Sequence, residues 1–449
     1  MKLQILVVFS LAICFTSFNV YSQKNLDLAK LDSLIAAVDG HNKTMGSLAL
    51  SHKGKVGYCK TWGYKAISDK EKIKSDDETK YRIGSISKTF TAVMILQLIE
   101  EKKLKFTTSL SDFFPELPNA KQITIEQMLS HRSGLYNFTD SAYFSYHTKP
   151  RTHDEMVAIF ASQSPVFSSG EKAEYSNTNF VLLGYIIEKL TKEPYATAVK
   201  KRITDKIGLK NTYYGSHANA AKNEAVSFRF NGEDWIKEEE TDMSITGGAG
   251  GLVSTSRDLI KFIEALFSNK LLRKESLAKM ITIKDGFGLG IFQFPFDEKY
   301  AFGHTGGIDE FHSMLGYFPK DSLAFAYTGN GETIEMNDLA IGVLSICFNR
   351  PYHIPDYGEE DFIPSEMLAK YEGIYASKQL PLKITVKKDG NRLSAQATGQ
   401  SSFFLTPISE NEFSFDPANI RLIFDRESEG DNMKFVLKQN GGNYVFLKE

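Results

Sequence analysis

The chain has 449 residues, a formal net charge of −2 at pH 7 and 42% hydrophobic residues. These proportions are those of an ordinary globular protein, and the near-neutral charge gives no electrostatic reason to expect binding to nucleic acid. The chain is longer than one hydrophobic core usually supports, so we expect two domains.

The first 22 residues have the pattern of a secretory signal peptide. Lys2 supplies a short basic region, residues 5–18 are largely apolar, and Ser22 is a small residue at the expected cleavage point. The apolar run is too short for a transmembrane helix. We therefore expect residues 1–22 to be removed, leaving a secreted or periplasmic protein without a membrane span. A retained N-terminal anchor is the alternative.

The domain that follows, residues 23–350, is predicted to be α+β. A helical apolar pattern covers residues 28–38, and a mostly helical region runs from about residue 86 to 205. A further helix is expected at residues 332–348. The strand-like segments are residues 47–51, 55–64, 287–294, 299–304, 313–318 and 323–328. This order is typical of an antiparallel sheet flanked by helices, with a helical subdomain inserted.

Residues 351–366 contain three prolines and several acidic residues, which favours a linker. Residues 367–449 then alternate short apolar runs with turns such as Asp389-Gly-Asn, a pattern typical of a small all-β barrel or sandwich domain. The expected strands are residues 382–386, 392–397, 403–407, 412–415, 420–424, 434–437 and 444–447.

The cysteines and histidines do not indicate a metal centre. Without the first 22 residues only Cys59 and Cys347 remain. Export would permit a disulfide between them, but cysteine is often simply a buried apolar residue, and we expect the two to be unpaired. No Cys/His grouping has metal-ligand spacing and no glycine-rich phosphate loop follows a strand, so we expect no metal and no cofactor.

The most informative motif is Ser85-Ile-Ser-Lys88, which precedes an apolar run typical of a buried helix and so places Ser85 in its first turn. Residues three apart share a helix face, so the Lys88 ammonium can lie over the Ser85 hydroxyl. A serine needs such a neighbouring base to become a nucleophile, and the helix N-terminus offers N–H groups to an oxyanion. Alone the motif is weak, because a chain of this length contains about one or two by chance.

Two further motifs follow it, Tyr175-Ser-Asn177 and His304-Thr-Gly306. In this order the three motifs form the active site of the penicillin-recognising serine hydrolases, which the chain resembles. It is most similar to the class C β-lactamase branch, which also contains DD-peptidases, esterases and D-amino-acid-specific amidases, many with an appended small β-domain. The resemblance covers roughly residues 26–349 and includes the connecting phrases at residues 128–135, 167–170, 250–259 and 302–308.

The resemblance implies a role for each motif residue. Ser85 is the expected nucleophile, and Lys88 and Tyr175 form the expected base system, with the first proton acceptor left open. Asn177 is expected to contact Lys88 and a substrate carbonyl. The N–H groups of Ser85 and Gly307 are expected to form the oxyanion hole.

The third motif, His304, Thr305 and Gly306, is expected to bind substrate together with Gly307. Histidine stands where many β-lactamases carry lysine, and a histidine is mostly neutral at pH 7, so a substrate carboxylate receives less help. We therefore expect peptidase or esterase activity rather than efficient β-lactam hydrolysis.

Several residues have simpler interpretations. Tyr175 has a structural alternative, as a packing residue near a helix start. The sequence His52-Lys-Gly resembles the third motif but precedes the nucleophile, and we expect a hairpin turn there. His131, His153 and His312 lie outside the motifs and are expected to be surface or packing residues.

The leading hypothesis is an exported serine hydrolase that forms an acyl-enzyme on an ester or amide, with a small molecule or a peptidoglycan peptide as substrate. The alternatives are a penicillin-binding sensor or scaffold that is acylated without turnover, a true β-lactamase, and a binding protein with an inactive pocket. The last is disfavoured because no reactive position is lost. The sequence leaves the substrate and the oligomeric state open.

Overall fold

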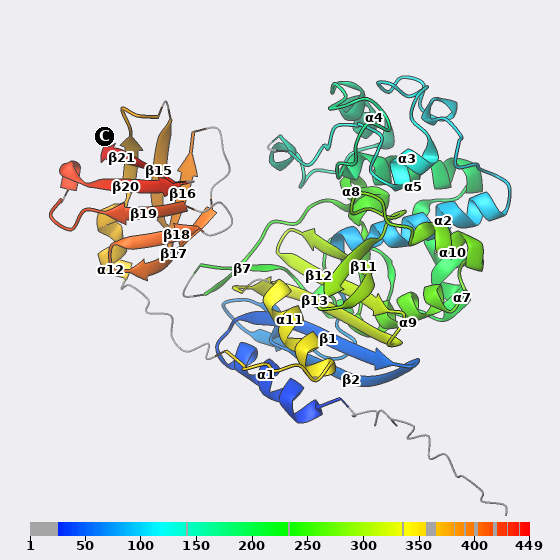
Figure 1. The fold of residues 1–449 in the computed structure, drawn as a ribbon, viewed down its shortest axis with the longest axis horizontal. Helices are drawn as coiled ribbons and strands as arrows, with labels where there is room; N and C mark the ends of the chain where they lie inside the picture. The colour runs from blue at the N-terminus through cyan, green and yellow to red at the C-terminus, as the bar shows by residue number, and fades with distance from the viewer. Residues whose placement is uncertain are drawn as a thin grey trace, which may run out of the picture.

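The computed structural model describes residues 26–140, 142–231, 234–334, 336–355, 365–380, 382–389, 392–398, 403–415, 420–428, 430–439 and 441–449. The expected signal peptide and residues 356–364 of the expected linker lie outside these ranges. Figure 1 shows a large domain of helices and sheet, and a smaller β-barrel formed by the C-terminal part of the chain.

A six-stranded antiparallel sheet forms the centre of the large domain, with the strand order β10-β11-β12-β13-β1-β2 (Figure 1). The N-terminal strand β1 pairs with the late strand β13, so the sheet unites the two ends of the domain. The β1–β2 turn has positive φ at Lys53 and Gly54, which confirms the hairpin expected there. The strands are β1 (Thr44–His52), β2 (Lys55–Trp62), β10 (Phe292–Phe296), β11 (Lys299–Ile308), β12 (Phe311–Phe318) and β13 (Leu323–Glu332).

Helices cover both faces of this sheet. Along β1, Leu48 and Leu50 face helices α1 (Leu28–Gly40) and α11 (Met336–Cys347), which lie side by side in Figure 1. The intervening Ala49 belongs to the core on the opposite face, where α9 (Ser256–Phe267) packs. Alternate residues of a strand point to opposite faces, and the small alanine leaves room for the helix.

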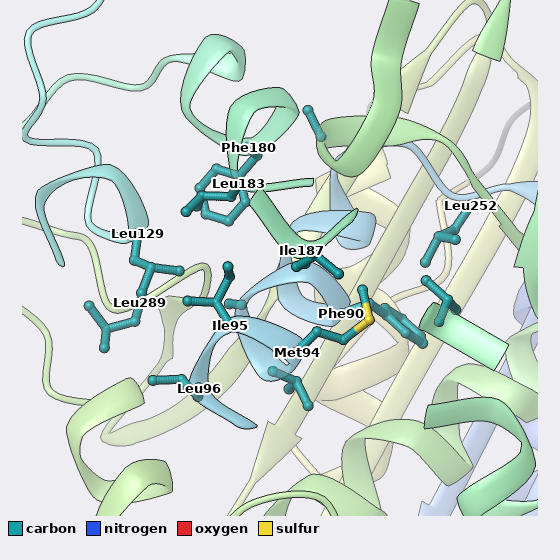
Figure 2. Packing of buried hydrophobic residues seen from close by; sticks show 14 of the residues in the cluster. Phe90, Met94, Ile95, Leu96, Leu129, Phe180, Leu183, Ile187, Leu252 and Leu289 are labelled. Atoms are coloured by element: carbon teal, nitrogen blue, oxygen red, sulfur yellow. The ribbon is translucent and has the colours of Figure 1, made fainter. Parts of the chain in front are cut away.

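The helical subdomain is organised around α2 (Ser87–Glu100), whose first twelve residues are buried. Figure 2 shows Phe90, Met94 and Ile95 of α2 in one apolar cluster with residues of α5 (Asn177–Thr191). A helix that is apolar all round requires cover on every side, and this packing fixes α2 between the sheet and the subdomain. The other helices here are α3 (Ile125–Leu129), α4 (His153–Ala161), α6 (Tyr195–Val199), α7 (Asp205–Ile207), α8 (Met243–Gly250) and α10 (Lys274–Met280).

Three small sheets complete the large domain. Strands β3 and β4 form the first, strands β5, β9 and β6 form the second in that order, and strands β7 and β8 form the third. Their bounds are β3 (Tyr64–Ile67), β4 (Lys72–Lys74), β5 (Tyr81–Arg82), β6 (Tyr213–Tyr214), β7 (Phe228–Phe230), β8 (Trp235–Lys237) and β9 (Leu252–Ser254).

The C-terminal part forms a closed barrel of strands β14 to β21. Of the two predicted arrangements, barrel or sandwich, the structure therefore has the barrel. Each predicted strand is present, but β14 was not predicted, and it closes the barrel by pairing with both β15 and β21. The barrel follows the short helix α12 (Ser365–Leu368) and encloses its own apolar core. Its strands are β14 (Gly373–Ala376), β15 (Lys383–Asp389), β16 (Arg392–Ala397), β17 (Phe403–Ser409), β18 (Glu412–Phe415), β19 (Ile420–Phe424), β20 (Lys434–Gln439) and β21 (Gly442–Lys448).

Two further findings bear on the sequence predictions. Cys59 and Cys347 are free thiols, as expected. In the described part of the chain, none of the helices combines the length and apolar character needed to cross a membrane.

Candidate active site

Ser85 lies in a single 3₁₀ turn, Gly84–Ile86, immediately before α2 rather than in the first turn of that helix. Gly84 has φ +45°, and a Cβ atom at this position would lie 2.8 Å from the backbone nitrogen of Gly307 in β11. Only glycine permits this close approach. The turn therefore rests directly on the strand that carries the third motif, which brings Ser85 beside Gly307.

Lys88 is fully buried, and its Nζ has three oxygen partners. Nζ lies 2.9 Å from Ser85 Oγ, 2.7 Å from Asn177 Oδ1 and 2.8 Å from the Ala249 carbonyl oxygen. Burial lowers the pKa of Lys88 well below its usual value. Nζ donates to all three of these oxygens, and the lowered pKa makes the neutral amine, whose lone pair can accept a proton from Ser85, more accessible than in a free lysine.

Tyr175 contacts the same hydroxyl from the other direction, and its OH donates to Ser85 Oγ at 2.8 Å. Burial raises the pKa of Tyr175 well above its usual value, and the hydrogen bond to Ser85 offsets this only in part. The phenol is therefore protonated at pH 7. Ser85 Oγ therefore lies between two donors, Tyr175 OH and Lys88 Nζ.

Asn177, the first residue of α5, is held by a loop that precedes it by about forty residues in the sequence. Its Nδ2 donates to Thr139 Oγ1 at 2.9 Å and to Asn137 Oδ1 at 3.2 Å. The contact with Lys88 is as expected, but the amide nitrogen is already engaged, so a substrate carbonyl would have to displace one of these two partners. Asn137 and Thr139 were not predicted, although they directly follow the phrase at residues 128–135.

The third motif lies on an open strand edge. Pairing between β10 and β11 ends at Gly303, which leaves residues 304–308 without a β10 partner. A Cβ at Gly306 would lie 2.1 Å from the Ile83 carbonyl oxygen, and Ser313 Oγ donates to that same oxygen at 2.9 Å. These contacts hold the 3₁₀ turn against β11. The two N–H groups expected to form the oxyanion hole therefore come from the two contacting segments, Ser85 from the turn and Gly307 from β11.

His304 is buried beneath this edge rather than exposed to substrate as a cation. Its Nδ1 donates to the Thr305 carbonyl oxygen, Nε2 has no partner among the described residues, and the ring packs against Phe292 at a centroid distance of 4.3 Å. Burial, together with the nearby Lys88, lowers the pKa of His304 to about 3. The imidazole is therefore neutral at pH 7.

The three histidines outside the motifs differ in their surroundings. His131 is buried, its ring stacks on Tyr175 at 4.5 Å, and its Nδ1 accepts from the Ser176 backbone N–H. It is a packing residue, as expected, but one that supports a motif residue. His153 and His312 lie elsewhere, against Glu188 and Glu332 respectively.

A cavity of about 590 Å³ opens beside the nucleophile. Ser85, Asn177 and Gly307 line it, together with residues of the 138–147 segment, of residues 238–250 and of the end of β11. No group of three or more His, Cys, Asp or Glu residues that could hold a metal ion occurs in the described ranges.

Comparison with known proteins identifies the family. Residues 31–344 match the family described as Beta-lactamase. The chain belongs to this family. Its fold is that of the β-lactamase-like serine hydrolases; residues of the first two motifs meet at the Ser85 hydroxyl, and the strand of the third motif lies against the turn that carries it.

The relatives of this β-lactamase-family chain have several names. Penicillin-binding protein 4* of Bacillus subtilis (strain 168) is 23% identical over 440 residues, which are 92% of this chain and 96% of the relative. A teichoic acid D-alanine hydrolase of Staphylococcus aureus is 26% identical over 286 residues, 63% of this chain and 67% of the relative. The solved D-amino acid amidase of Ochrobactrum anthropi SV3 is 25% identical with a TM-score of 0.62, covering 72% of this chain and 99% of the amidase.

Proposed function

We propose that this protein is an exported serine hydrolase that cleaves an ester or amide through an acyl-enzyme on Ser85. One observation carries the proposal: the Ser85 hydroxyl lies between Lys88 Nζ at 2.9 Å and Tyr175 OH at 2.8 Å, at the edge of an open cavity. Export is inferred from residues 1–22 alone.

The lowered pKa of Lys88 and the raised pKa of Tyr175 support one arrangement of protons in the first step. Neutral Lys88 takes the proton of Ser85 as Oγ forms a bond to the substrate carbonyl carbon, and the carbonyl π electrons move to its oxygen beside the N–H groups of Ser85 and Gly307. Tyr175, still protonated, donates its proton to the departing alcohol or amine as the bond to the leaving group breaks. The proton that Lys88 took from Ser85 then passes to the Tyr175 phenolate, which returns both groups to their starting states.

Water completes the reaction. A water molecule adds to the acyl carbonyl and gives up a proton to the Lys88–Tyr175 pair, the bond to Oγ breaks, and Ser85 recovers a proton while the carboxylic acid departs. The net reaction consumes one water molecule and needs no other co-reactant.

The substrate class follows from His304 and from the relatives. A neutral His304 does not neutralise a substrate carboxylate, which disfavours peptides with a free C-terminus and efficient β-lactam hydrolysis. Two relatives carry the names teichoic acid D-alanine hydrolase and D-amino acid amidase, which supports an ester or amide substrate. A penicillin-binding sensor that is acylated without turnover is the second candidate, because another relative is named a penicillin-binding protein.

Covalent labelling and turnover test this proposal. A fluorophosphonate probe should label the protein at Ser85, and Ser85→Ala should remove labelling while the protein remains folded. The exposed Ser162→Ala variant is the matched control and should label normally. Intact-mass analysis that places the adduct on another serine would refute the assignment. Continuous release of product from a chromogenic ester distinguishes a hydrolase from a sensor, which reacts once. The mass of protein purified from the exported fraction tests cleavage after residue 22.

A further inference from the structure

Two side chains on one face of α2 bind the end of helix α8. Helix α8 ends at Gly250, and the last carbonyl groups of a helix have no partner within it. Thr91 Oγ1 donates to the Gly248 carbonyl oxygen at 2.6 Å. Lys88 Nζ donates to the next carbonyl oxygen, that of Ala249, at 2.8 Å. Lys88 and Thr91 are three residues apart on α2, so one face of this helix holds two neighbouring carbonyls of α8.

The Thr91 hydroxyl is in turn bound by Tyr195, the first residue of α6. The two hydroxyl oxygens lie 2.6 Å apart, and both side chains are buried. Burial raises the pKa of Tyr195 above its usual value, so the phenol keeps its proton at pH 7 and donates it to Thr91. The single Thr91 proton is then left for a carbonyl oxygen. The Gly248 oxygen at 2.6 Å is closer than the other acceptor, the Ser87 oxygen at 3.2 Å.

The position of the Ala249 carbonyl affects the reaction because it holds Lys88. The other two partners of Lys88 Nζ are Ser85, which is the group to be activated, and Asn177. The Ala249 carbonyl is therefore the anchor of Nζ on the side of α8. Because Gly248 is the adjacent residue, its bond to Thr91 limits how far this carbonyl can move. A displacement of about 1 Å in a reacting group can cost about 10²-fold in rate.

We propose that Thr91 and Tyr195 are positioning residues that act through α8, by holding the Ala249 carbonyl where it keeps Lys88 Nζ within reach of Ser85. Neither residue is among the described lining residues of the cavity beside Ser85. Tyr195 lines a separate cavity of about 380 Å³, and residues of α8 contribute to the walls of both cavities. The inference rests on the proposed role of Lys88 as the base, and it adds two residues that support that role from outside the substrate cavity.

Removal of single hydroxyl groups tests this proposal. Thr91→Val and Tyr195→Phe each remove one hydroxyl and keep most of the buried volume, whereas Thr91→Ser keeps the hydroxyl. The matched control is Tyr375→Phe, which removes a buried tyrosine hydroxyl that donates to the Tyr371 carbonyl oxygen at 2.8 Å in the barrel. The rate of fluorophosphonate labelling and kcat/KM on a neutral chromogenic ester are measured with the full chain, and melting temperatures are recorded for every variant.

The expected rates follow the order of the hydrogen bonds. Thr91→Val should label about 10–100-fold more slowly than wild type, because the bond to Gly248 is lost. Tyr195→Phe should label about threefold more slowly, because the Thr91 hydroxyl can still bind Gly248 but is no longer directed to it. The double variant should be no slower than Thr91→Val, since Tyr195 acts through Thr91. Thr91→Ser should stay within about threefold of wild type, and Tyr375→Phe should label at the wild-type rate even if it melts earlier.

The pH profile of labelling distinguishes positioning from a loss of stability. The other titratable groups around Lys88 in the described part of the chain are Tyr175, whose pKa is raised, and His131 and His304, whose pKa values are lowered. We therefore expect the acid limb of the profile to follow Lys88. A carbonyl that has moved away no longer stabilises the Lys88 ammonium, so the acid limb of Thr91→Val should shift to lower pH. The limb of Tyr375→Phe should stay in place.

Wild-type labelling rates in Thr91→Val, or a slower rate with an unmoved acid limb, would overturn the positioning role. If Thr91→Val does not fold, Tyr195→Phe and Thr91→Ser decide the question, and a wild-type rate and acid limb in Tyr195→Phe would overturn the role in the same way. In each of these cases the proposed function survives as long as the wild-type protein labels at Ser85 and turns over the ester. If Ser85 is not labelled, or Lys88→Ala labels normally, the proposed function of these residues fails and this inference fails with it.

Discussion

The barrel and the active-site region differ in how far apart in the sequence their contacting residues lie. In the barrel every strand pairs with the next strand in the chain, and one additional pairing, β14 with β21, closes it around a separate core. At the catalytic junction, by contrast, Lys88 contacts Asn177 and Ala249, and the turn at Ser85 rests on Gly306 and Gly307. The barrel is therefore built from local contacts, whereas the active site exists only when distant segments meet.

This difference predicts where the protein is sensitive. A substitution at the catalytic junction leaves buried polar groups of several segments without a hydrogen-bond partner. These groups are shielded from water, so water cannot replace the lost partner. A change in the barrel is confined to its own core. The predictions below test this contrast in order of decreasing effect.

The largest effect is expected at Lys88 and Tyr175. Lys88→Ala and Tyr175→Phe should each lower kcat/KM by about 10²–10⁴-fold, because each removes one half of the proton transfer. The double variant should lose little more than the worse single variant, since both act on one nucleophile. Steady-state rates and the rate of fluorophosphonate labelling measure this, and the exposed Lys149→Ala is the control. Losses that multiply would show that the two residues act independently.

A single methyl group at the strand edge should also be damaging. In Gly306→Ala the new Cβ would meet the Ile83 carbonyl oxygen at 2.1 Å, so the turn that carries Ser85 must move away from β11. We expect a destabilisation of about 1–3 kcal/mol together with loss of most activity. Gly40→Ala adds the same methyl at a position with no atom within 4 Å, and it should leave both unchanged. Thermal melting and labelling measure the two effects, and equal behaviour of the two variants would contradict the close packing.

The buried histidine makes a smaller, pH-dependent contribution. The pKa of His304 is about 3 in the folded protein, against 6.5 for an unperturbed histidine, so the unfolded chain binds the extra proton between these values. Stability is therefore lost as the pH falls below about 6.5, by roughly 2 kcal/mol at pH 5. His304→Gln should melt at a temperature that falls less between pH 7 and pH 5 than that of wild type. The exposed His41→Gln should follow wild type. Equal acid sensitivity of wild type and His304→Gln would show that His304 titrates normally.

The neutral state of the His304 imidazole also leads to a prediction about reaction rates. Because His304 does not change charge between pH 5 and pH 8, ester and carboxylate-terminated substrates should have parallel pH profiles. A selective loss of the carboxylate-terminated substrate as pH rises would show that a protonated His304 binds it.

Local patterns predicted most of the fold. Alternating and helical apolar spacing placed helix α1, the strands of the six-stranded sheet and seven strands of the barrel, because each element buries one face. The strand expected at residues 287–294 begins only at Phe292, and the short strands β3 to β9 were not predicted. β14 was not predicted because a four-residue strand carries too little pattern, and its role depends on closure with β21. The 3₁₀ turn at Ser85 also escaped prediction, since it depends on the contact between Gly84 and β11.

The resemblance of the three motifs to those of a known family predicted the motif residues, but it did not predict the residues that contact them or their burial. Asn137 and Thr139 hold Asn177, and nothing in their own sequence spacing shows that they reach it. The neutral state of His304 depends on complete burial, which a motif does not reveal. The carboxylates of the cavity come from two segments about seventy residues apart, 238–239 and 309–310, and only the fold brings them together.

The smallest effect is expected from removing the barrel. Its described side-chain contacts with the large domain centre on Arg229, which binds Asp389 at 2.7 Å and lies over the Phe404 ring at 5.5 Å. A partly exposed ion pair of this kind contributes less than about 1 kcal/mol, so a chain ending near residue 356 should fold, melt close to wild type and label at Ser85. Insolubility or loss of labelling in the shortened chain would show that the two domains depend on a shared core. A selective loss on large polymeric substrates would instead indicate that the barrel helps to hold them.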